Sequence, residues 1–233
     1  MTACGVSEGR IAPDVSGGAM FAKPERYYQA ARRDLVLAMP NGPHRVLDVG
    51  CGMGQTGRAL KDEGKAVEVV GLEKEADVAA TAAAKLDRVL VVDVEKADLP
   101  LDDGYFDYII MGDILEHLYD PWKTVSRLAQ WLRQGGYMLA SLPNVRYWRV
   151  LGDLVLRGQW RYRIEGVLDR THIRFFTKRT MKGLFSSERF TVTRVMPGFQ
   201  FYPASKSRFA NRLTLGVFEE FLTRQYLIEA QKL

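Results

Sequence analysis

Short hydrophobic runs alternate with amphipathic stretches through the first two thirds of the chain. Five runs predict strands: His44–Val49, Ala66–Leu72, Arg88–Val94, Tyr105–Gly112 and Tyr137–Leu142. Between them, helical spacing predicts helices over Gln55–Glu63, Ala76–Ala84 and Trp122–Arg133. Such alternation indicates a parallel sheet with helices on both faces. The wholly apolar run Val89–Val92 suits a sheet that is covered on both sides.

The two ends of the chain extend this pattern. Apolar positions at helical spacing predict a helix over Pro24–Met39, which the following Pro-Asn-Gly-Pro turn ends. Near the other end we expect a helix at about Lys178–Ser186 and two strands, Thr191–Met196 and Tyr226–Gln231. The predicted fold class is therefore α/β, doubly wound, with a mostly parallel seven-stranded sheet and a late basic insertion.

Changes in composition along the chain indicate one domain with additions. Residues 1–19 are rich in Gly, Ala, Ser and Val and are interpreted as a flexible lead-in, while residues 20–233 form the domain. Residues 145–176 carry many arginines and aromatics and are predicted to form an insertion or lid. Residues 199–220 form a second, aromatic insertion, and its pattern fits either a lid or a homodimer contact.

Bulk composition limits the classes of protein to which the chain can belong. The 233 residues are 47% hydrophobic and 26% charged, a globular balance that argues against a disordered or fibrous protein. The two cysteines, Cys4 and Cys51, exclude a disulfide scaffold and favour a reducing compartment. Apolar runs are too short for a membrane span, and the amino-terminal residues lack a signal-peptide core. We expect a cytoplasmic protein without a membrane span.

A glycine-rich turn separates the first predicted strand from the first helix of the alternation. Gly50, Gly52 and Gly54 allow a sharp turn and the close approach of a ligand. Gly52, Gly54 and Gly57 also satisfy G-x-G-x-x-G, and Glu73 follows at the offset of a ribose-binding acid. On this motif alone, a nicotinamide-dependent oxidoreductase is an alternative interpretation.

The acid ahead of the turn favours another ligand. Asp48 lies at the carboxyl end of the first strand, where such sheets bind their ligands. A carboxylate there repels a pyrophosphate but attracts a cation. S-adenosylmethionine carries an ammonium and a sulfonium group, has no phosphate, and keeps the ribose diol that Glu73 could bind through two hydrogen bonds. Charge therefore favours S-adenosylmethionine over a nicotinamide dinucleotide.

At this point the chain resembles the class I S-adenosylmethionine-dependent methyltransferases, whose fold is Rossmann-like. The match comprises Asp48, Gly50, Gly52 and Gly54 as D-x-G-x-G-x-G, then Glu73, Asp93-Val94, Phe106-Asp107, Gly112-Asp113-Ile114-Leu115-Glu116-His117 and Leu132–Gly136. The resemblance implies S-adenosyl-L-methionine as cofactor. It implies a cofactor site made of Tyr27, Arg32, Asp48, Gly50, Cys51, Gly52, Gly54, Glu73, Lys74, Asp93, Val94, Gly112, Asp113 and Ile114.

The resemblance also implies particular roles. Glu73 would bind the ribose, Asp93 and Val94 would meet the adenine, and Arg32 would face the cofactor carboxylate. Tyr27 and Arg32 lie on the first predicted helix, which could equally well pack its tyrosines against the sheet. Cys51 suits packing or backbone geometry better than chemistry.

Later segments are similar to one bacterial subgroup of that family. Residues 141–149 and 166–177 look like members that accompany glycosyltransferases in surface-polysaccharide pathways. A related group from methionine biosynthesis shares the pattern more loosely and leaves open a non-catalytic, cofactor-binding regulatory subunit. The main hypothesis is O-methylation of a sugar, a nucleotide-linked sugar or another small metabolite.

The chain has three histidines, and two of them are candidates for the base that O-methylation requires. His44 begins the first strand, away from the ligand side, whereas His117 follows the fourth strand and His172 lies in the basic segment. Either of the last two could deprotonate a hydroxyl, with Asp113 or Glu116 assisting, since imidazole titrates near pH ~6.5. Both could instead be structural. No His/Cys cluster has metal-ligand spacing, so no metal is predicted.

Charge is unevenly distributed. The whole chain carries +5, whereas Arg146 to Arg179 contains nine Lys/Arg and three acids, a balance of +6. Interleaved aromatics and arginines suit sugar rings and phosphates, so an acidic or phosphate-bearing sugar is the favoured acceptor. The candidate substrate contacts are Arg146, Tyr147, Trp148, Arg170 and Arg174. RNA or a peptide could also bind this surface, and a helix face that only contacts solvent would show the same composition. The rest of the chain is nearly neutral, which argues against general nucleic-acid binding.

Overall fold

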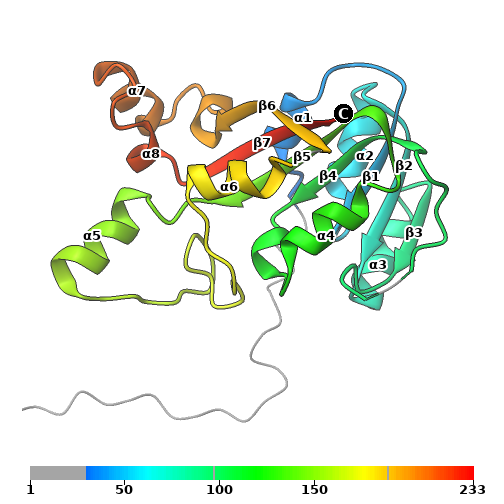
Figure 1. Ribbon diagram of the computed structural model, residues 1–233, viewed down its shortest axis with the longest axis horizontal. Helices are drawn as coiled ribbons and strands as arrows, with labels where there is room; N and C mark the ends of the chain where they lie inside the picture. Colours follow the sequence, from blue (N-terminus) through cyan, green and yellow to red (C-terminus); the bar gives the residue numbers. More distant parts are fainter. Residues whose placement is uncertain (1–29, 97, 188) are drawn as a thin grey trace, which may run out of the picture.

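A computed structural model describes residues 30–96, 98–187 and 189–233. Within these ranges seven strands form one sheet in the order β3-β2-β1-β4-β5-β7-β6 (Figure 1). The strands are β1 (His44–Val49), β2 (Ala66–Glu73), β3 (Arg88–Val91), β4 (Phe106–Gly112), β5 (Leu132–Pro143), β6 (Phe190–Pro197) and β7 (Gln225–Lys232). β7 runs antiparallel to β5 and β6, and the other pairings are parallel. The predicted Rossmann-like, mostly parallel sheet is confirmed.

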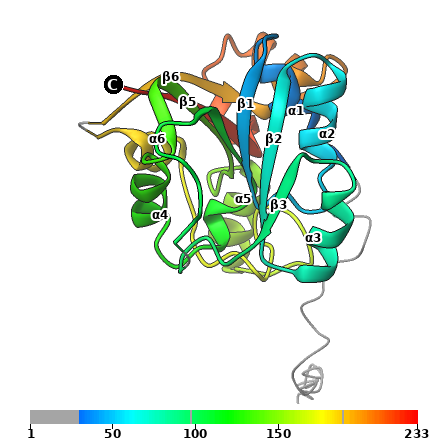
Figure 2. The same cartoon turned by 90° about the vertical axis from the view of Figure 1, so that its right-hand side faces the viewer.

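Helices cover both faces of the sheet (Figure 2). One face carries α1 (Arg33–Ala38), α2 (Gln55–Asp62) and α3 (Ala76–Ala83), and the other carries α4 (Pro121–Leu128) and α6 (Lys178–Phe185). Each helix buries one apolar side, such as Leu60 of α2 or Val125 and Leu128 of α4. Because the central strands are buried from both sides, they are apolar throughout rather than alternating.

The strand order reverses next to β1. Asp48 pairs with Gly71 of β2 on one side and with Ile110 of β4 on the other. The chain runs outward from β1 through β2 to β3 and then returns to start the other half at β4. Open α/β sheets bind ligands at such a switch point, beyond the carboxyl ends of the strands. The turn after β1 and the turn after β4 therefore face a common crevice.

Several predicted boundaries were wrong. The first helix, expected over Pro24–Met39, begins only at Arg33 within the described residues, so Arg32 precedes it as the N-cap instead of lying on it. The third strand ends at Val91 rather than Val94, so residues 92–94 leave the sheet. The helix expected over Trp122–Arg133 ends at Leu128, because Leu132 already pairs with Phe106 at the start of β5. In β3 and α4 the apolar pattern continues past the residue at which the backbone leaves the strand or the helix, so the pattern alone predicted elements that were too long.

The two predicted insertions contain helices that the hydrophobic pattern did not indicate. α5 (Trp148–Arg157) lies in the basic segment, and α7 (Lys206–Leu213) and α8 (Glu219–Leu222) lie in the second insertion. All three extend from one end of the molecule, far from β3 (Figure 1). Only Val150 of α5 is buried and none of the residues of α7 or α8 is, which explains why the pattern was weak. The division at residues 19 and 20 falls outside the described residues and stays a prediction.

Candidate active site

A cavity of about 620 Å³ opens beyond the carboxyl ends of β1, β2 and β4. Most of the predicted site residues line it: Arg32, Gly50, Cys51, Gly52, Glu73, Lys74, Asp93, Val94, Gly112, Asp113, Ile114 and His117. Asp48, Gly54 and His172 do not line it, and Tyr27 lies outside the described residues. Sequence motifs scattered over more than 80 positions thus meet in one place because the parallel strands end at the same edge.

The first two glycines of the turn form part of the cavity wall. Gly50 and Gly52 have φ of 72° and 54°, in the left-handed region that favours glycine. A Cβ on Gly50 would lie 3.1 Å from Ile114, which also faces the cavity. A side chain at Gly50 would therefore take space from a ligand as well as strain the backbone.

The later glycines, Gly54 and Gly57, allow close helix packing instead of the close approach of a ligand that the motif predicted for Gly54. A Cβ on Gly54 would lie 3.2 Å from Ala82, and one on Gly57 would lie 2.6 Å from Leu86. Both glycines let α2 pack closely against α3 and the residues that follow it. The G-x-G-x-x-G match is real as a packing motif, but it is no evidence for a pyrophosphate.

Glu73 is held in the cavity wall by backbone donors. One carboxylate oxygen accepts from the Gly52 N–H at 2.9 Å, and the other accepts from Lys74 N–H at 2.8 Å and Glu75 N–H at 3.1 Å. The side chain is nearly buried, at 9% exposure. These bonds fix the carboxylate and link the two turns that flank the cavity. A fixed carboxylate at the end of β2 can accept two hydrogen bonds from a diol.

Asp93 is a second carboxylate of the cavity, just beyond β3. Burial by itself would raise the pKa of Asp93, but hydrogen bonds from Lys96 and from the Glu95 N–H outweigh it and hold the pKa below the ordinary value. Lys96 Nζ lies 3.1 Å from the Asp93 carboxylate and Lys74 Nζ lies 3.9 Å away. Asp93 is therefore ionised at neutral pH and available to an amino group of a ligand.

Asp48 lies beneath the cavity rather than in its wall. It is 4% exposed, and its Oδ2 has no hydrogen-bond partner among the described residues. Burial, and then the nearby charge of Glu73, raise the pKa of Asp48 to about 7. The carboxyl that the motif placed beside the ligand is thus buried and does not line the cavity.

The raised pKa of Asp48 predicts a dependence of stability on pH. The folded chain holds this proton more tightly than the unfolded chain, so stability falls as pH rises toward about 7. We expect Asp48→Asn to raise the free energy of unfolding at about pH 8, by up to ~4 kcal/mol, with the difference shrinking near pH ~5. Denaturant melts at the two pH values measure it.

Asp107→Asn is the control for that experiment. Burial alone would raise the pKa of Asp107, but the Arg45 N–H at 2.8 Å and Arg133 Nε at 2.5 Å hold it below its ordinary value. Its replacement should lower stability at neutral pH, the opposite sign. Equal destabilisation by both variants at about pH 8 would show that Asp48 is ionised and satisfied.

Arg32 connects α1 to the cavity. Burial by itself would lower its pKa, but Asp113 and Asp34 raise the pKa above the ordinary value, so the guanidinium stays charged. Its Nη2 donates to Asp34 at 2.8 Å and to Ser141 Oγ at 2.7 Å, and its Nη1 pairs with Asp113. A ligand carboxylate could bind Arg32 only by sharing the guanidinium with these three residues.

Asp113 is the strained residue of this network. Its φ of 62° is positive, which is uncommon for a residue other than glycine. Besides Arg32, its carboxylate accepts from Ser141 Oγ at 3.3 Å and from Gln225 Nε2. Sequence reasoning missed Ser141 and Gln225, which meet because β7 pairs with the end of β5. No local pattern could have indicated that pairing.

The two candidate histidines lie together at the cavity edge. Their rings meet edge to face with centroids 4.7 Å apart. His117 Nδ1 lies 3.0 Å from the Thr171 carbonyl, and His172 Nδ1 lies 3.0 Å from the Val167 carbonyl. A carbonyl only accepts, so each Nδ1 carries a proton, and Nε2 is the ring nitrogen that can take part in proton transfer. His117 lines the cavity, whereas His172 is buried behind it.

Glu116 completes a group with these histidines. It is 1% exposed, and its Oε1 lies 3.8 Å from His172 Nε2. Its carbonyl accepts from the Ile173 and Arg174 N–H groups, both at 3.0 Å, which holds the basic insertion against the turn after β4. One ligand atom from each of Glu116, His117 and His172 lies within 4.8 Å of the others, a grouping that could hold a metal ion. The fold thus creates a grouping that spacing did not suggest.

The predicted substrate residues lie outside the cavity wall. Arg146 pairs with Glu220 of α8, and Arg174 Nε donates to the Tyr119 carbonyl at 3.0 Å. Tyr147 packs beside α5, while Trp148 and Arg170 are exposed. Their substrate roles stay predictions. Thr171, which sequence reasoning did not single out, brings the insertion into the cavity wall.

Comparison with known proteins identifies the family to which this chain is similar. A family model described as a methyltransferase domain matches residues 21–195. A "Probable S-adenosylmethionine-dependent methyltransferase" of Mycolicibacterium smegmatis is 34% identical over 123 residues, covering 52% of this chain and 47% of that protein. A ubiquinone biosynthesis O-methyltransferase of Bartonella quintana is 27% identical over 172 residues, 72% of this chain and 68% of that protein. The chain spans about half the length of several curated relatives it matches.

Solved structures share the fold. A SAM-dependent methyltransferase from Archaeoglobus fulgidus superposes with a TM-score of 0.59 at 20% identity, covering 89% of this chain and 97% of that one. One from Mesorhizobium loti gives 0.58 at 22% identity, covering 87% and 98%. The fold and cavity define a cofactor-binding α/β enzyme domain. The chain belongs to the class I S-adenosylmethionine-dependent methyltransferases.

The cavity fits the cofactor of that family. Glu73 and Asp93 present carboxylates, Gly50 and Gly52 leave room for close approach, and Arg32 supplies a cation at the α1 side. Such a donor set suits a ligand with a diol, an amino group and a sulfonium, and opposes a pyrophosphate. S-adenosyl-L-methionine is the cofactor, and the nicotinamide alternative fails. No helix in the described part of the chain is long and apolar enough to cross a membrane.

Proposed function

We propose that this methyltransferase O-methylates a hydroxyl of a small acceptor, with His117 as the general base. The acceptors that we favour are a sugar, a nucleotide-linked sugar or another small metabolite. The observation that carries the proposal is the position of His117, whose ring lines the same cavity as Gly50, Gly112 and Asp113. A base must reach both the acceptor and the site of methyl transfer, and among the chain's three histidines His117 alone is in that wall.

The geometry supports a simple division of work. S-adenosyl-L-methionine, when bound, supplies an electrophilic methyl group at its sulfonium. His117 Nε2 accepts the proton of the acceptor hydroxyl, while the Thr171 carbonyl holds the opposite nitrogen in its N–H form. His172 packs against the ring and is a positioning residue.

Other residues orient the reacting groups. Arg32 and Asp113 fix the turn after β4, whose strained backbone places Gly112 and Ile114 in the cavity wall. In-line transfer depends on such orientation and on the exclusion of water more than on further acid–base chemistry. We assign Glu73, Asp93 and Val94 to the nucleoside half of the cofactor and Arg32 to its carboxylate.

The acceptor itself is proposed from charge. Arg170 and Trp148 are exposed on the same insertion that supplies Thr171, which supports an acidic or phosphate-bearing sugar. The polysaccharide-pathway subgroup and the cytoplasmic location are further parts of this proposal. A non-catalytic cofactor-binding subunit, the remaining alternative, predicts cofactor binding without turnover.

A methyl-transfer screen tests the proposal. With tritiated S-adenosyl-L-methionine, we expect label to move to at least one member of a panel of sugars, sugar phosphates, nucleotide sugars and small phenols. The methylated product should lose its label when the methyl ether is cleaved, as an O-methyl group does. Transfer only to amines or carbon acids would contradict O-methylation, and cofactor binding with no transfer would favour the regulatory alternative.

A further inference from the structure

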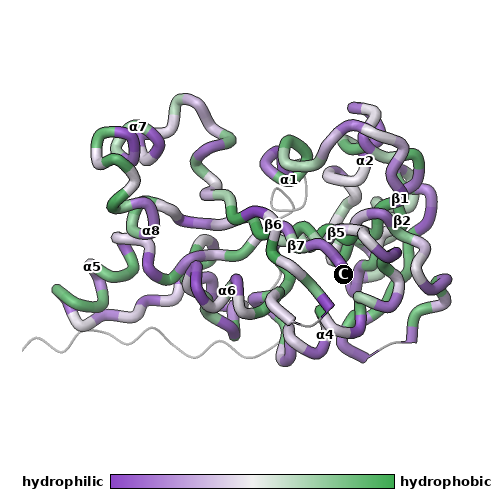
Figure 3. The backbone as a smooth tube through the Cα atoms, turned by 45° about the horizontal axis from the view of Figure 1, so that its top comes forward, coloured by the Kyte–Doolittle hydropathy of each residue, from purple (hydrophilic) through white to green (hydrophobic). Residues whose placement is uncertain are grey.

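Two exposed apolar projections extend from the same end of the molecule. The α5 tip comprises residues 153–165, and the α7–α8 arm comprises residues 206–218, that is, α7 and the turn that leads to α8 (Figure 1). In the α5 tip, Val155 is 76% and Leu156 84% exposed, and in the arm Leu213 is 68% and Leu215 91% exposed. Further exposed apolar side chains in the two projections are Leu154, Trp160, Tyr162, Ile164, Phe209, Val217 and Phe218. Figure 3, which colours the chain by the hydropathy of its residues, shows hydrophobic residues at the outer end of α5.

So much exposed apolar area needs an explanation in terms of function. Single exposed leucines are common, but clusters of large apolar side chains mark a surface that contacts a protein or a membrane. In α5, Val150 and the residues around it already bury the inner side against Val167 and Leu168. The outer residues are therefore not needed for the attachment of α5.

Both projections are basic. The α5 tip carries Arg157, Arg161 and Arg163 against Asp153 and Glu165, a balance of +1, and both Arg157 and Arg163 pair with Asp153. The α7–α8 arm, residues 206–218, carries Lys206, Arg208 and Arg212 and no acid, a balance of +3. The acids of α8 itself, Glu219 and Glu220, pair with Lys178 and Arg146 at the base of the arm. Together they hold +4 of the chain's +5, and these six cationic side chains are exposed. A partner that covers them must be negatively charged as well as apolar.

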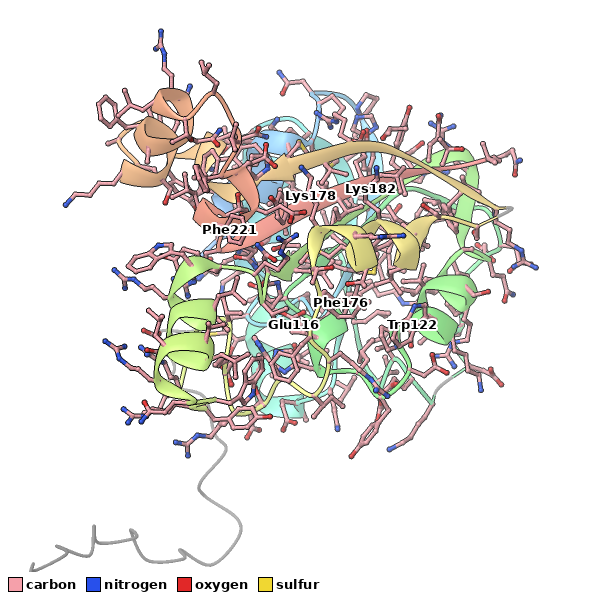
Figure 4. The ribbon with its side chains drawn as sticks, turned by 60° about the vertical axis from the view of Figure 1, so that its left-hand side comes forward. Glu116, Trp122, Phe176, Lys178, Lys182 and Phe221 are labelled. Atoms are coloured by element: carbon pink, nitrogen blue, oxygen red, sulfur yellow. The ribbon has the colours of Figure 1, made fainter. Side chains whose placement is uncertain are left out.

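The two projections are joined at their bases. Asn144, which is fully buried, donates from Nδ2 to the Glu220 carbonyl at 2.7 Å and to the Thr223 carbonyl at 2.8 Å. The Arg146 guanidinium pairs with Glu220 and lies 4.9 Å from the centre of the Phe221 ring. Phe221 belongs to α8 (Figure 4), and Arg146 lies two residues before α5. The projections therefore form one end of the molecule with a fixed relation at the base.

We propose that the α5 tip and the α7–α8 arm dock the protein on the surface of an anionic lipid bilayer. Aliphatic side chains enter the boundary between headgroups and acyl chains, Trp160 and Tyr162 lie at headgroup level, and the arginines and lysine meet lipid phosphates. The binding is peripheral. A second copy of this chain is disfavoured as the partner, because two surfaces of the same positive charge would repel each other.

Vesicle sedimentation tests the proposal on the full chain. We expect the protein to bind vesicles of phosphatidylcholine mixed with phosphatidylglycerol and to bind vesicles of pure phosphatidylcholine far more weakly. The double variant Leu156→Asp/Leu213→Asp should reduce binding at least about tenfold. The triple variant Lys206→Gln/Arg208→Gln/Arg212→Gln should reduce binding to the anionic vesicles and remove most of its salt dependence.

A matched control separates this surface from exposed apolar residues in general. Leu37 and Val67 are 51% and 57% exposed and lie outside both projections, so Leu37→Asp/Val67→Asp should bind vesicles as the unaltered chain does. No binding to anionic vesicles, or equal loss in the control, would overturn the proposal. So would a dimer in sedimentation equilibrium that Leu156→Asp/Leu213→Asp dissociates, because the occupant would then be a second copy.

Discussion

Replacing Glu73 with glutamine should weaken the binding of S-adenosylhomocysteine about a hundredfold while leaving the chain folded. The carboxylate is held toward the cavity by the N–H groups of Gly52, Lys74 and Glu75. An amide cannot accept on both sides, so its NH₂ group would face at least one of these donors. Hydrogen bonds to a carboxylate contribute ~1.5–3 kcal/mol each, so the loss of the two bonds to the ribose diol accounts for the expected factor.

The measurement is isothermal titration of the ligand into each variant, with thermal melts to check folding. Glu75→Gln is the matched control, because Glu75 is an exposed acid of the same cavity wall, only two residues further along. It makes the same change of charge without disturbing the linked turns. If both variants bound equally well, Glu73 would be a structural acid and its assignment to the ribose would fail.

Replacing His117 with alanine should lower kcat by about 10²- to 10⁴-fold, the usual contribution of a general base, with little change in cofactor affinity. The substitution removes the one imidazole of the cavity wall. A base acts only when deprotonated, so the rate of the unaltered enzyme should rise with pH along its acid limb. In His117→Ala that limb should be absent, which a purely structural role would not produce.

The chain offers two comparisons for this variant. His44 lies at the amino end of β1, far from the cavity, and His44→Gln should leave kcat unchanged. His172→Gln removes the ring that packs on His117, so it should lower kcat but keep the acid limb. Full turnover in His117→Ala would show that His117 is not the base and that catalysis depends on the positioning of the reactants. A loss that tracks added chelator in the unaltered enzyme would instead favour a metal bound to Glu116, His117 and His172.

Local sequence was enough to predict much of the cavity wall. The strand–turn–helix pattern around Gly50 and Gly52 and the acids Glu73 and Asp93 at strand ends all predict residues of one cavity. Parallel strands in this fold must end at the same edge, so their final residues meet whatever the details of packing. Asp48 shows the limit of this reasoning, because the motif identifies it but only the structure reveals that it is buried and does not line the cavity.

Sequence by itself determined the α/β architecture, the position of the ligand edge and the charge that favours a cation over a pyrophosphate. These follow from hydrophobic periodicity and from residues close together in the chain. Tertiary structure decided which distant residues touch: Asp113 with Ser141 and Gln225, His117 with His172, and α8 with Asn144. Those contacts depend on the antiparallel pairing of β7 with β5 and on the path of the insertion, which no local pattern encodes.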